Sequence, residues 1–254
     1  MKINPLRFSL TTRFKERHIF QMLNIKCGER ILDVGCGIGY LCGLAKIRGA
    51  NIVGIDMSTE ALRYSQSTLQ GSFVCAGAGT LPFSDNQFDK IIFADVIEHV
   101  PDDNLALQEI VRVAKPTASV VVSTPELESL FTKTRLKTFL HDDDDQYQKN
   151  YREGYTTNSL CELMKQNSID IQRVAYSNFF LSEILLGITK LAYASQRQQY
   201  NSQSDLVIIS DSWMFWIYKT IIFPCFLGLG LLEDLVCRRW VKGHCLIVSG
   251  KVLK

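Results

Sequence analysis

Residues 31–40 read ILDVGCGIGY, and this stretch decides the fold. The mostly apolar residues 31–34 are typical of a buried parallel strand, and glycines follow at positions 35, 37 and 39. Residues 41–45 then begin a helical pattern. Glycine permits a sharp turn and a close backbone approach to a ligand, and a helix N-terminus offers free N–H groups. The stretch predicts a strand, a turn and a helix that form a nucleotide pocket, although a glycine turn alone is often only a tight connection.

The next apolar stretch, 51–55, ends in a carboxylate, Asp56, 17 residues after Gly39. An acidic side chain at the tip of the second strand can accept both hydroxyl hydrogens of an adenosine ribose. The alternative is that Asp56 caps the helix expected at 58–70. The dinucleotide fingerprint G-x-G-x-x-G would need glycine at Tyr40, which argues against a nicotinamide oxidoreductase.

The chain continues as an alternation of buried runs and amphipathic stretches. We expect further strands at 72–75, 90–94, 118–123 and 244–252, and helices at 11–24, 103–114 and 157–166. This alternation predicts a doubly wound α/β fold. A chain of 254 residues is long enough for one large domain of this kind or a domain with a sizeable insert.

Three motifs appear in order: ILDVGCGIGYLCGLA from residue 31, VGIDMS from residue 53 and LPFSDNQFDKIIFADVIEHV from residue 81. Together they resemble the class I S-adenosylmethionine-dependent methyltransferases, and most closely the branch that includes the ubiquinone-pathway O-methyltransferases. The resemblance covers residues 25–175. It implies a seven-stranded Rossmann-like sheet with S-adenosylmethionine lying over the ends of the first two strands.

The resemblance also implies cofactor contacts. The residues that would surround the methionine half are Asp33, Gly35, Cys36, Gly37 and Gly39. Asp56 would hold the ribose, Met57 would flank the adenine, and Ala94 belongs to the same site. Arg7 lies in an N-P-L-R element whose arginine, in the ubiquinone branch, meets the cofactor carboxylate; the alternative is an exposed N-terminal arginine.

One position departs from the family. The family usually reads G-D-A before L-P-F, with the aspartate meeting the adenine amino group, whereas this chain has Gly77 there, followed by Ala78. Backbone groups of Gly77 and Ala78 are expected to meet the ring edge instead. The lost charge-assisted hydrogen bond is worth about 1.5–3 kcal/mol.

The second chemical cluster is Asp95, Glu98 and His99, directly after the strand 90–94. Methyl transfer needs donor and acceptor held in line and, for a hydroxyl acceptor, removal of its proton. We predict His99 as the base, with Glu98 and Asp95 beside it. The spacing of these three residues also resembles a divalent-metal site of the ubiquinone branch. The other alternative is that they only stabilise the turn after the strand. We assign no metal.

Tyr151, Arg152 and Tyr155 are weaker candidates for the border of the acceptor pocket, by the same resemblance. There is no N-P-P-Y or D-P-P-Y tetrad at Ala94, which argues against methylation of a nucleic-acid amine.

Residues 179–236 depart from the minimal family pattern. A run of about twenty residues from Trp213 to Leu232 carries one charge, Lys219, and is long enough to cross a membrane. The strand at 244–252 must return to the sheet, so we exclude a single crossing. We predict two short helices around Pro224 lying on a membrane surface; the alternatives are a lid over the acceptor pocket or a dimer face. Within 205–236 and just beyond it, the expected membrane contacts are Trp213, Phe215, Trp216, Phe223 and Phe226 with acyl chains and Arg238 and Arg239 with phosphates.

Composition limits partners and compartment. A net charge of +2 gives no basic field for nucleic acid. Eight cysteines without a C-x-x-C pair predict reduced, mostly buried thiols. Residues 1–7 lack the apolar run of a signal peptide, and the acidic run 141–145 is expected to be a solvated loop. We expect a cytoplasmic protein, with a peripheral location on a membrane as the alternative, and the oligomeric state is undetermined.

These observations predict three parts: a methyltransferase core at 1–178, a hydrophobic helical insert or lid at 179–236, and a last strand at 237–254 that returns to the core sheet. The expected activity is S-adenosylmethionine-dependent methyl transfer to a small, apolar or lipid-linked acceptor, at oxygen. The alternative is a non-catalytic, membrane-associated scaffold that keeps the fold.

Overall fold

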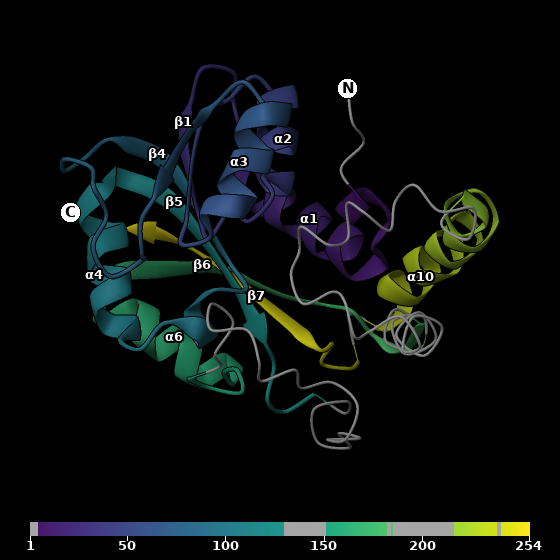
Figure 1. The fold of residues 1–254 in the computed structure, drawn as a ribbon. Helices are drawn as coiled ribbons and strands as arrows, with labels where there is room; N and C mark the ends of the chain where they lie inside the picture. Colours follow the sequence, from purple (N-terminus) through teal and green to yellow (C-terminus); the bar gives the residue numbers. More distant parts are fainter. Residues whose placement is uncertain (1–4, 130–150, 182–183, 185–215, 238–239) are drawn as a thin grey trace.

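The computed structural model describes residues 5–129, 151–181, 184, 216–237 and 240–254 (Figure 1). The acidic run 141–145 and the predicted membrane contacts Trp213, Phe215, Arg238 and Arg239 lie outside these residues. The strands are β1 (Arg30–Val34), β2 (Asn51–Asp56), β3 (Ser72–Cys75), β4 (Phe88–Ala94), β5 (Ala114–Pro125), β6 (Ile169–Ser177) and β7 (Cys245–Val252). The helices are α1 (Leu10–Leu23), α2 (Tyr40–Ile47), α3 (Thr59–Thr68), α4 (Asp103–Val113), α6 (Thr157–Gln166) and α10 (Phe223–Cys237), with short turns η1 (Pro5–Phe8), η2 (Ile97–His99) and η4 (Tyr218–Ile222).

The predicted fold class is confirmed. One seven-stranded sheet has the order β3-β2-β1-β4-β5-β7-β6, in which β7 runs antiparallel to both of its neighbours. The chain leaves β1 toward β2 on one side and returns to β4 on the other. The carboxyl ends of β1 and β4 therefore form the switch point at which open α/β sheets bind ligands.

Consecutive strand residues enter two separate cores, because side chains alternate between the faces of a strand. Ile91 packs in the core that α4 and α6 cover, and Ile92 packs in the core that α1, α2 and α3 cover. Both isoleucines are fully buried. Burial on both faces explains why the strands appear in the sequence as continuous apolar runs.

β5 begins earlier than the predicted 118–123. It starts at Ala114, which pairs with Phe88, and the register shifts before Lys90 pairs with Ser119. Within that shift Thr117 has a φ of 63°. A bulge accommodates Pro116, which cannot donate to a regular ladder, so the proline ends helix α4 without delaying the strand.

The cysteines only partly match the prediction. All eight are free, but Cys27, Cys75 and Cys225 are exposed. The expectation of mostly buried thiols was wrong for these three, because each lies near the end of an element or on an outward helix face rather than within a strand interior.

The predicted pair of helices around Pro224 was also wrong. Residues 216–237 are helical without a break, and Pro224 lies just after the π-helical turn η4. The N–H of Phe223 donates to the carbonyl of Tyr218, five residues back. Such a wide turn relieves the backbone ahead of a proline, so the helix continues instead of reversing.

α10 packs along α1 at the edge of the molecule (Figure 1). A Cβ at Gly230 would lie 2.4 Å from the ring of Phe14, so glycine is needed for this close contact. Asp234 is 3% exposed and lies 3.3 Å from Nε2 of His18. The acidic side chains of α10 thus face the protein together with Phe223, whereas Leu229, Leu232, Leu235 and Val236 are exposed.

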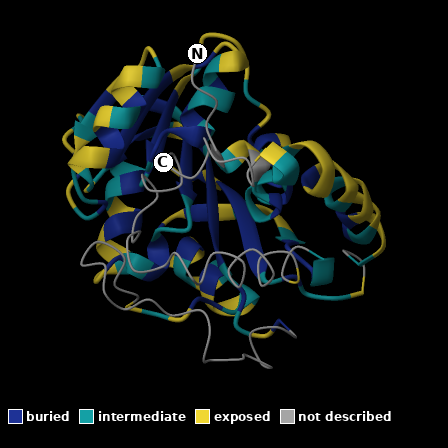
Figure 2. Cartoon of the chain, turned by 45° about the vertical axis from the view of Figure 1, so that its right-hand side comes forward, coloured by how far each residue is buried: buried dark blue, intermediate teal, exposed yellow. Residues whose placement is uncertain are grey.

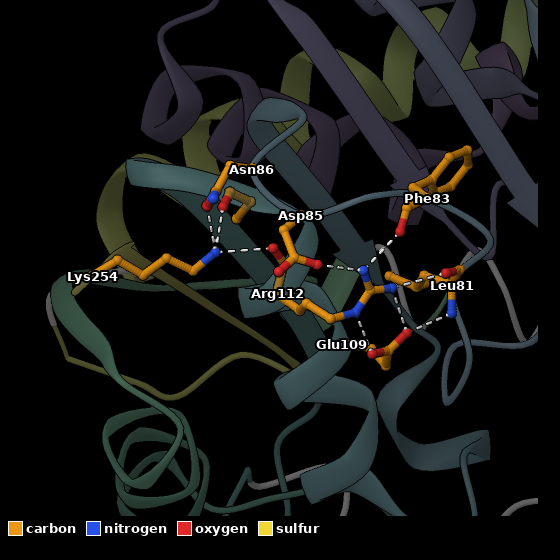
Figure 3. Close-up of polar contacts among 8 residues, drawn as sticks. Leu81, Phe83, Asp85, Asn86, Glu109, Arg112 and Lys254 are labelled. Carbon is orange, nitrogen blue, oxygen red and sulfur yellow. Dashed lines mark hydrogen bonds and ion pairs between the residues drawn. The ribbon is translucent and has the colours of Figure 1, made fainter.

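Arg112 fixes the loop between β3 and β4 (Figure 3). Its guanidinium donates to the carbonyls of Leu81 and Phe83 at 2.9 and 2.7 Å and to Asp85 at 2.8 Å. It also forms a two-pronged pair with Glu109, whose carboxylate accepts the N–H of Leu81 at 2.7 Å. One arginine of α4 therefore sets the course of the segment that follows Gly77 and Ala78.

We predict that Arg112→Ala lowers the free energy of unfolding by roughly 1.5–3 kcal/mol, the range for hydrogen bonds to a charged group. Chemical denaturation measures this. Arg63→Ala is the matched control, since Arg63 is an exposed arginine of α3 and surface substitutions usually stay within about 0.5 kcal/mol. Equal effects of the two substitutions would contradict the role of Arg112.

Candidate functional site

The glycine turn after β1 is held by backbone hydrogen bonds to β2. The N–H groups of Gly35 and Cys36 both donate to the carbonyl of Ile55 at 2.8 Å. Gly35 has a φ of 74°, and a Cβ there would lie 2.3 Å from a methyl group of Val96. Glycine is therefore required both by the backbone conformation and by the close approach of the segment after β4.

The second half of the turn is fixed by α3. The hydroxyl of Ser65 donates to the carbonyl of Gly37 at 3.0 Å. Gly39 is the N-cap of α2 with a φ of 72°, and a Cβ there would lie 2.8 Å from Leu69. The turn thus joins β1, β2, α2 and α3 at the switch point of the sheet.

Asp56 ties the tip of β2 to this turn. One carboxylate oxygen accepts the N–H of Gly37 at 2.7 Å, and the other accepts the N–H of Ser58 at 2.8 Å. The N-cap of α3 is Ser58 rather than Asp56, because the Ser58 hydroxyl accepts the N–H of Ala61 at 3.2 Å. Each Asp56 oxygen keeps a second lone pair, which is what a ribose diol would use.

Met57 and Gly77 border the next part of the site. Met57 is 60% exposed. A Cβ at Gly77 would lie 3.9 Å from the Met57 sulfur and would have no other heavy atom within 4 Å. Ala78 is buried beside them. A flat ring fits this open border, and together with the Asp56 oxygens the donor and acceptor set fits an adenosine group.

Asp33 anchors α2 to β1. It is 2% exposed and accepts a hydrogen bond from the Cys42 thiol at 3.2 Å. Burial raises the pKa of Asp33 to about 7, and the charge of Asp56 adds to the rise. Its predicted contact with a cofactor stays a prediction.

Arg7 is exposed in η1. Burial raises the pKa of Glu16 on α1, and the positive charges of Arg13, Arg48 and Arg7 are among the influences that oppose the rise. Arg7 thus acts on α1, and its predicted contact with a cofactor carboxylate stays a prediction.

Lys15 of α1 reaches the carboxyl end of β4, where it forms an ion pair with Asp95. Asp95 has a φ of 55° and accepts a hydrogen bond from the Ser123 hydroxyl at 3.0 Å. Burial lowers the pKa of Lys15, while nearby Cys245 and Glu98 oppose that change. Sequence reasoning missed Lys15; the available signal was a lysine flanked by Phe14 in the predicted first helix, which by itself indicates only a solvated side chain.

Glu98 lies within the same cluster. It is 4% exposed, and burial raises its pKa to about 7, opposed in part by the charge of Lys15. Its backbone carbonyl accepts the N–H groups of Tyr151 and Arg152 at 3.0 and 3.2 Å. A buried carboxyl and a buried amine therefore meet beside the predicted acceptor position, with the half-buried His99 next in the chain.

Within the described ranges, no three His, Cys, Asp or Glu side chains gather as a group that could hold a metal ion. Asp95, Glu98 and His99 do not form such a group, and the metal alternative stays a prediction.

The segment 151–155 braces the site. The Tyr155 hydroxyl donates to Asp103 at 2.6 Å, and Tyr155 is 6% exposed. Arg152 donates to the carbonyl of Val100 at 2.7 Å and pairs with Asp103 at 3.1 Å. The polar groups of Arg152 and Tyr155 are committed to this bracing, so of the three weaker candidates only Tyr151 is exposed toward solvent.

We predict that Glu98→Gln removes a pH-dependent loss of stability. Because the folded pKa of Glu98 is raised above its ordinary value of 4.5, its protonated form contributes stability that is complete below pH 4.5 and is lost as the pH rises through about 7. Glutamine stays neutral, so the variant should exceed the wild type in free energy of unfolding by an amount that grows to about 3 kcal/mol above pH 7.

Denaturation at a series of pH values measures this difference. Glu60→Gln, at an exposed position of α3, is the control and should leave the pH profile unchanged. Parallel profiles for wild type and Glu98→Gln would show that Glu98 ionises normally.

Comparison with known proteins connects this geometry to a family. A profile described as a methyltransferase domain matches residues 32–122. The chain is 36% identical over 129 residues to a ubiquinone biosynthesis O-methyltransferase from Alkalilimnicola ehrlichii, a match that covers 48% of this chain and 49% of that protein. It is 36% identical over 102 residues to norajmaline N-methyltransferase from Rauvolfia serpentina, covering 37% and 35%. The chain thus spans about half the length, or less, of these curated relatives.

Solved structures share the whole fold. A SAM-dependent methyltransferase from Thermotoga maritima, described as a possible histamine N-methyltransferase, superimposes with a TM-score of 0.61 at 16% identity over 96% of this chain and 92% of that chain. The [4+2]-cyclase SpnF gives 0.61 at 18% identity over 94% and 80%. At these identities the likeness establishes the fold alone. The sequence matches do more: residues 32–122 match the methyltransferase domain profile, and that part of the chain is similar in sequence to known methyltransferases.

Proposed function

We propose that the protein transfers a methyl group from S-adenosylmethionine to an oxygen atom of a small, apolar or lipid-linked acceptor. The observation that carries the proposal is the joining of Asp56 to the glycine turn, with an open border at Gly77 and Met57 beside it. This arrangement supplies a diol acceptor, a sharp backbone turn and space for a flat ring in the order an adenosylated ligand needs.

Bound S-adenosylmethionine supplies a methyl carbon that its sulfonium already activates. The residues of the chain hold and align: Asp56 accepts from the ribose, Met57 and Gly77 border the adenine, and the 35–39 turn approaches the methionine half. The aligned geometry lowers the barrier because donor and acceptor no longer need to find each other in solution.

On the acceptor side, side chains of the protein would remove the proton of the acceptor hydroxyl. His99 is proposed to take the hydroxyl proton, and the buried Glu98 and Lys15 adjust the local charge next to it. A carboxyl with a pKa of about 7 changes protonation near neutral pH, as acid–base chemistry requires, and burial lowers the pKa of the neighbouring Lys15 amine.

Oxygen as the acceptor atom is supported by several ubiquinone biosynthesis O-methyltransferases among the relatives. The norajmaline N-methyltransferase matches much of the same domain, so the domain by itself does not select the atom. The buried acid–base cluster favours oxygen, because a neutral amine acceptor needs no base before transfer whereas a hydroxyl does.

An apolar acceptor and a membrane location are supported by the outward face of the α10 helix. The helical segment Tyr218–Cys237 has 20 residues with a mean hydropathy of 1.8, and 17% of its most apolar window is buried. Figure 2 shows this edge of the molecule as largely exposed. We propose peripheral attachment, since one side of α10 is docked on α1 and β7 re-enters the sheet at Cys245. A helix of this length and composition is weak evidence on its own.

The competing proposal is a non-catalytic scaffold. SpnF, titled a cyclase, shares the fold, which illustrates that the fold alone does not determine the chemistry. A glycine at position 77 is the observation that favours a weakened donor site. The intact turn and Asp56 favour the enzyme.

We predict that the protein transfers labelled methyl groups from S-adenosylmethionine into a lipid extract, and that His99→Ala lowers turnover by roughly 10²–10⁴-fold with donor affinity unchanged. Mild base releases labelled methanol from methyl esters in the extracted lipid, and hydriodic acid then releases labelled iodomethane from methyl ethers, which separates both from N-methyl products. His18→Ala is the control histidine, because His18 faces Asp234 on α10. Full turnover by His99→Ala would remove it as the base, and donor binding without any transfer would favour the scaffold.

We also predict that Gly77→Asp tightens the donor, by roughly 10-fold or more, since a hydrogen bond to a charged group is worth about 1.5–3 kcal/mol. The added side chain meets only the Met57 sulfur at an ordinary contact distance. Gly79→Asp adds the same charge in the same loop, where its Cβ would meet Leu105 at 3.5 Å, and should not tighten binding. If titration calorimetry gave equal or weaker affinity for Gly77→Asp, another residue would already fill the adenine contact.

A further inference from the structure

A groove of about 530 Å³ lies where α1, the end of α2 and α10 meet. Three arginines line it, Arg13 and Arg17 from α1 and Arg48 from the end of α2. Leu227 and Leu231 of α10 form its other wall. The domain's predicted cofactor contacts do not include this groove, and the proposed methyl transfer does not use it.

The arginines are arranged for an external anion. Arg13 and Arg17 are four residues apart and so share one face of α1. Arg48 stacks on the ring of Phe20 at 4.1 Å and donates to the carbonyl of Leu44 at 2.8 Å, which holds its guanidinium in place. Arg17 remains 47% exposed. A planar guanidinium with several donors suits phosphate oxygens.

Two carboxylates oppose this charge only in part. Glu16 pairs with Arg13, and burial raises the pKa of Glu16 while the arginine charges oppose that rise. Asp234 lies 4.0 Å from Arg17 and 3.3 Å from His18. The groove lining carries three arginines and one carboxylate, Glu16, so positive charge still exceeds negative charge there.

The apolar neighbour of the groove identifies the source of the anion. Leu227 and Leu231 continue into the outward face of the helical segment formed by η4 and α10, where the apolar side chains that are more than half exposed include Ile221, Leu229, Leu232, Leu235 and Val236. Trp216 and Trp240 flank this helix with exposed fractions of 58% and 86%. Tryptophans at both ends of an apolar face, with arginines along its side, are typical of a helix lying in a lipid interface.

We propose that this groove, defined by Arg13, Arg17 and Arg48, binds the phosphate headgroup of an anionic phospholipid while α10 lies in the membrane surface. This proposal deepens the membrane location proposed above and rests on it. Leu227 and Leu231 would contact the acyl chains below the headgroup, and the three guanidiniums would contact the phosphate. The groove thereby makes attachment depend on lipid charge as well as on apolar burial.

Vesicle sedimentation of the full chain tests the proposal, with neutral phosphatidylcholine vesicles and vesicles containing phosphatidylglycerol. Wild type should bind the anionic vesicles more tightly, and the preference should shrink as salt is raised. Arg13→Gln/Arg17→Gln should weaken anionic binding by roughly 30-fold, at about 1 kcal/mol for each arginine near an anionic surface. Arg63→Gln/Arg173→Gln removes the same charge from exposed positions on α3 and β6 and should retain most of the binding.

Each contrary outcome overturns the proposal in a recognisable way. Equal affinity for both vesicle types, or an equal loss of vesicle affinity in both double variants, would show that the groove does not bind the phospholipid headgroup. Binding of inorganic phosphate without binding of vesicles would identify a soluble anion as the ligand of the groove. A dimer in light scattering that does not bind vesicles would show that α10 forms an interface between two copies of the chain. S-adenosylmethionine titration of the same samples reports whether the variants fold, and Arg48→Gln replaces the double variant if they do not. If the protein binds S-adenosylmethionine but not vesicles, only the membrane proposal is contradicted. If it binds vesicles but not S-adenosylmethionine, only the proposed enzyme activity is contradicted.

Discussion

The structure depends on the left-handed glycine turn that leaves β1. Its N–H groups at Gly35 and Cys36 donate to Ile55, and that of Gly37 donates to Asp56, so the turn is held against the second strand. A side chain at Gly35 would collide with Val96, which follows the fourth strand. The same few atoms therefore fix the ends of β1, β2 and β4 relative to one another. Any ligand that occupies the switch point contacts a surface that three strands have already placed.

Around that turn the protein separates two tasks. The β2 side offers oxygens and open space at Asp56, Met57 and Gly77, and it needs no buried charge beyond Asp33. The β4 side contains the buried charges, where Lys15 pairs with the partly exposed Asp95 and lies close enough to the buried Glu98 for each charge to act on the other. Burying an amine beside carboxylates costs stability unless the pairing is good, and such costs concentrate at functional sites. The outer edge adds a third feature, because α10 turns Asp234 and Gly230 toward α1 and presents leucines outward.

The sequence predicted the sheet, the turn and the order of most elements because these follow from local rules. Buried apolar runs, glycines with positive φ and the caps of the helices are readable along the chain. It did not predict Lys15, because a lysine in a helix becomes notable only when folding carries it across to Asp95. It predicted a break at Pro224 that the π turn before the proline avoids, and a late start to β5 that the bulge at Thr117 removes. The sequence also did not indicate a role for Arg112 or Arg48, because their partners lie on other elements.

The central claim is that Asp56 and the glycine turn form an S-adenosylmethionine site. Titration calorimetry of the wild type, Asp56→Ala and Asp89→Ala with S-adenosylmethionine, S-adenosylhomocysteine and NAD tests it most directly. Asp89 is the matched control because it also accepts a backbone N–H, that of Arg30 at 2.9 Å, at the opposite end of the sheet. We expect both adenosyl ligands to bind the wild type and Asp89→Ala, NAD not to bind, and Asp56→Ala to lose about 1.5–3 kcal/mol of binding free energy. A folded wild-type protein that binds neither adenosyl ligand at millimolar concentration, or an Asp56→Ala variant that binds them undiminished, would contradict the account.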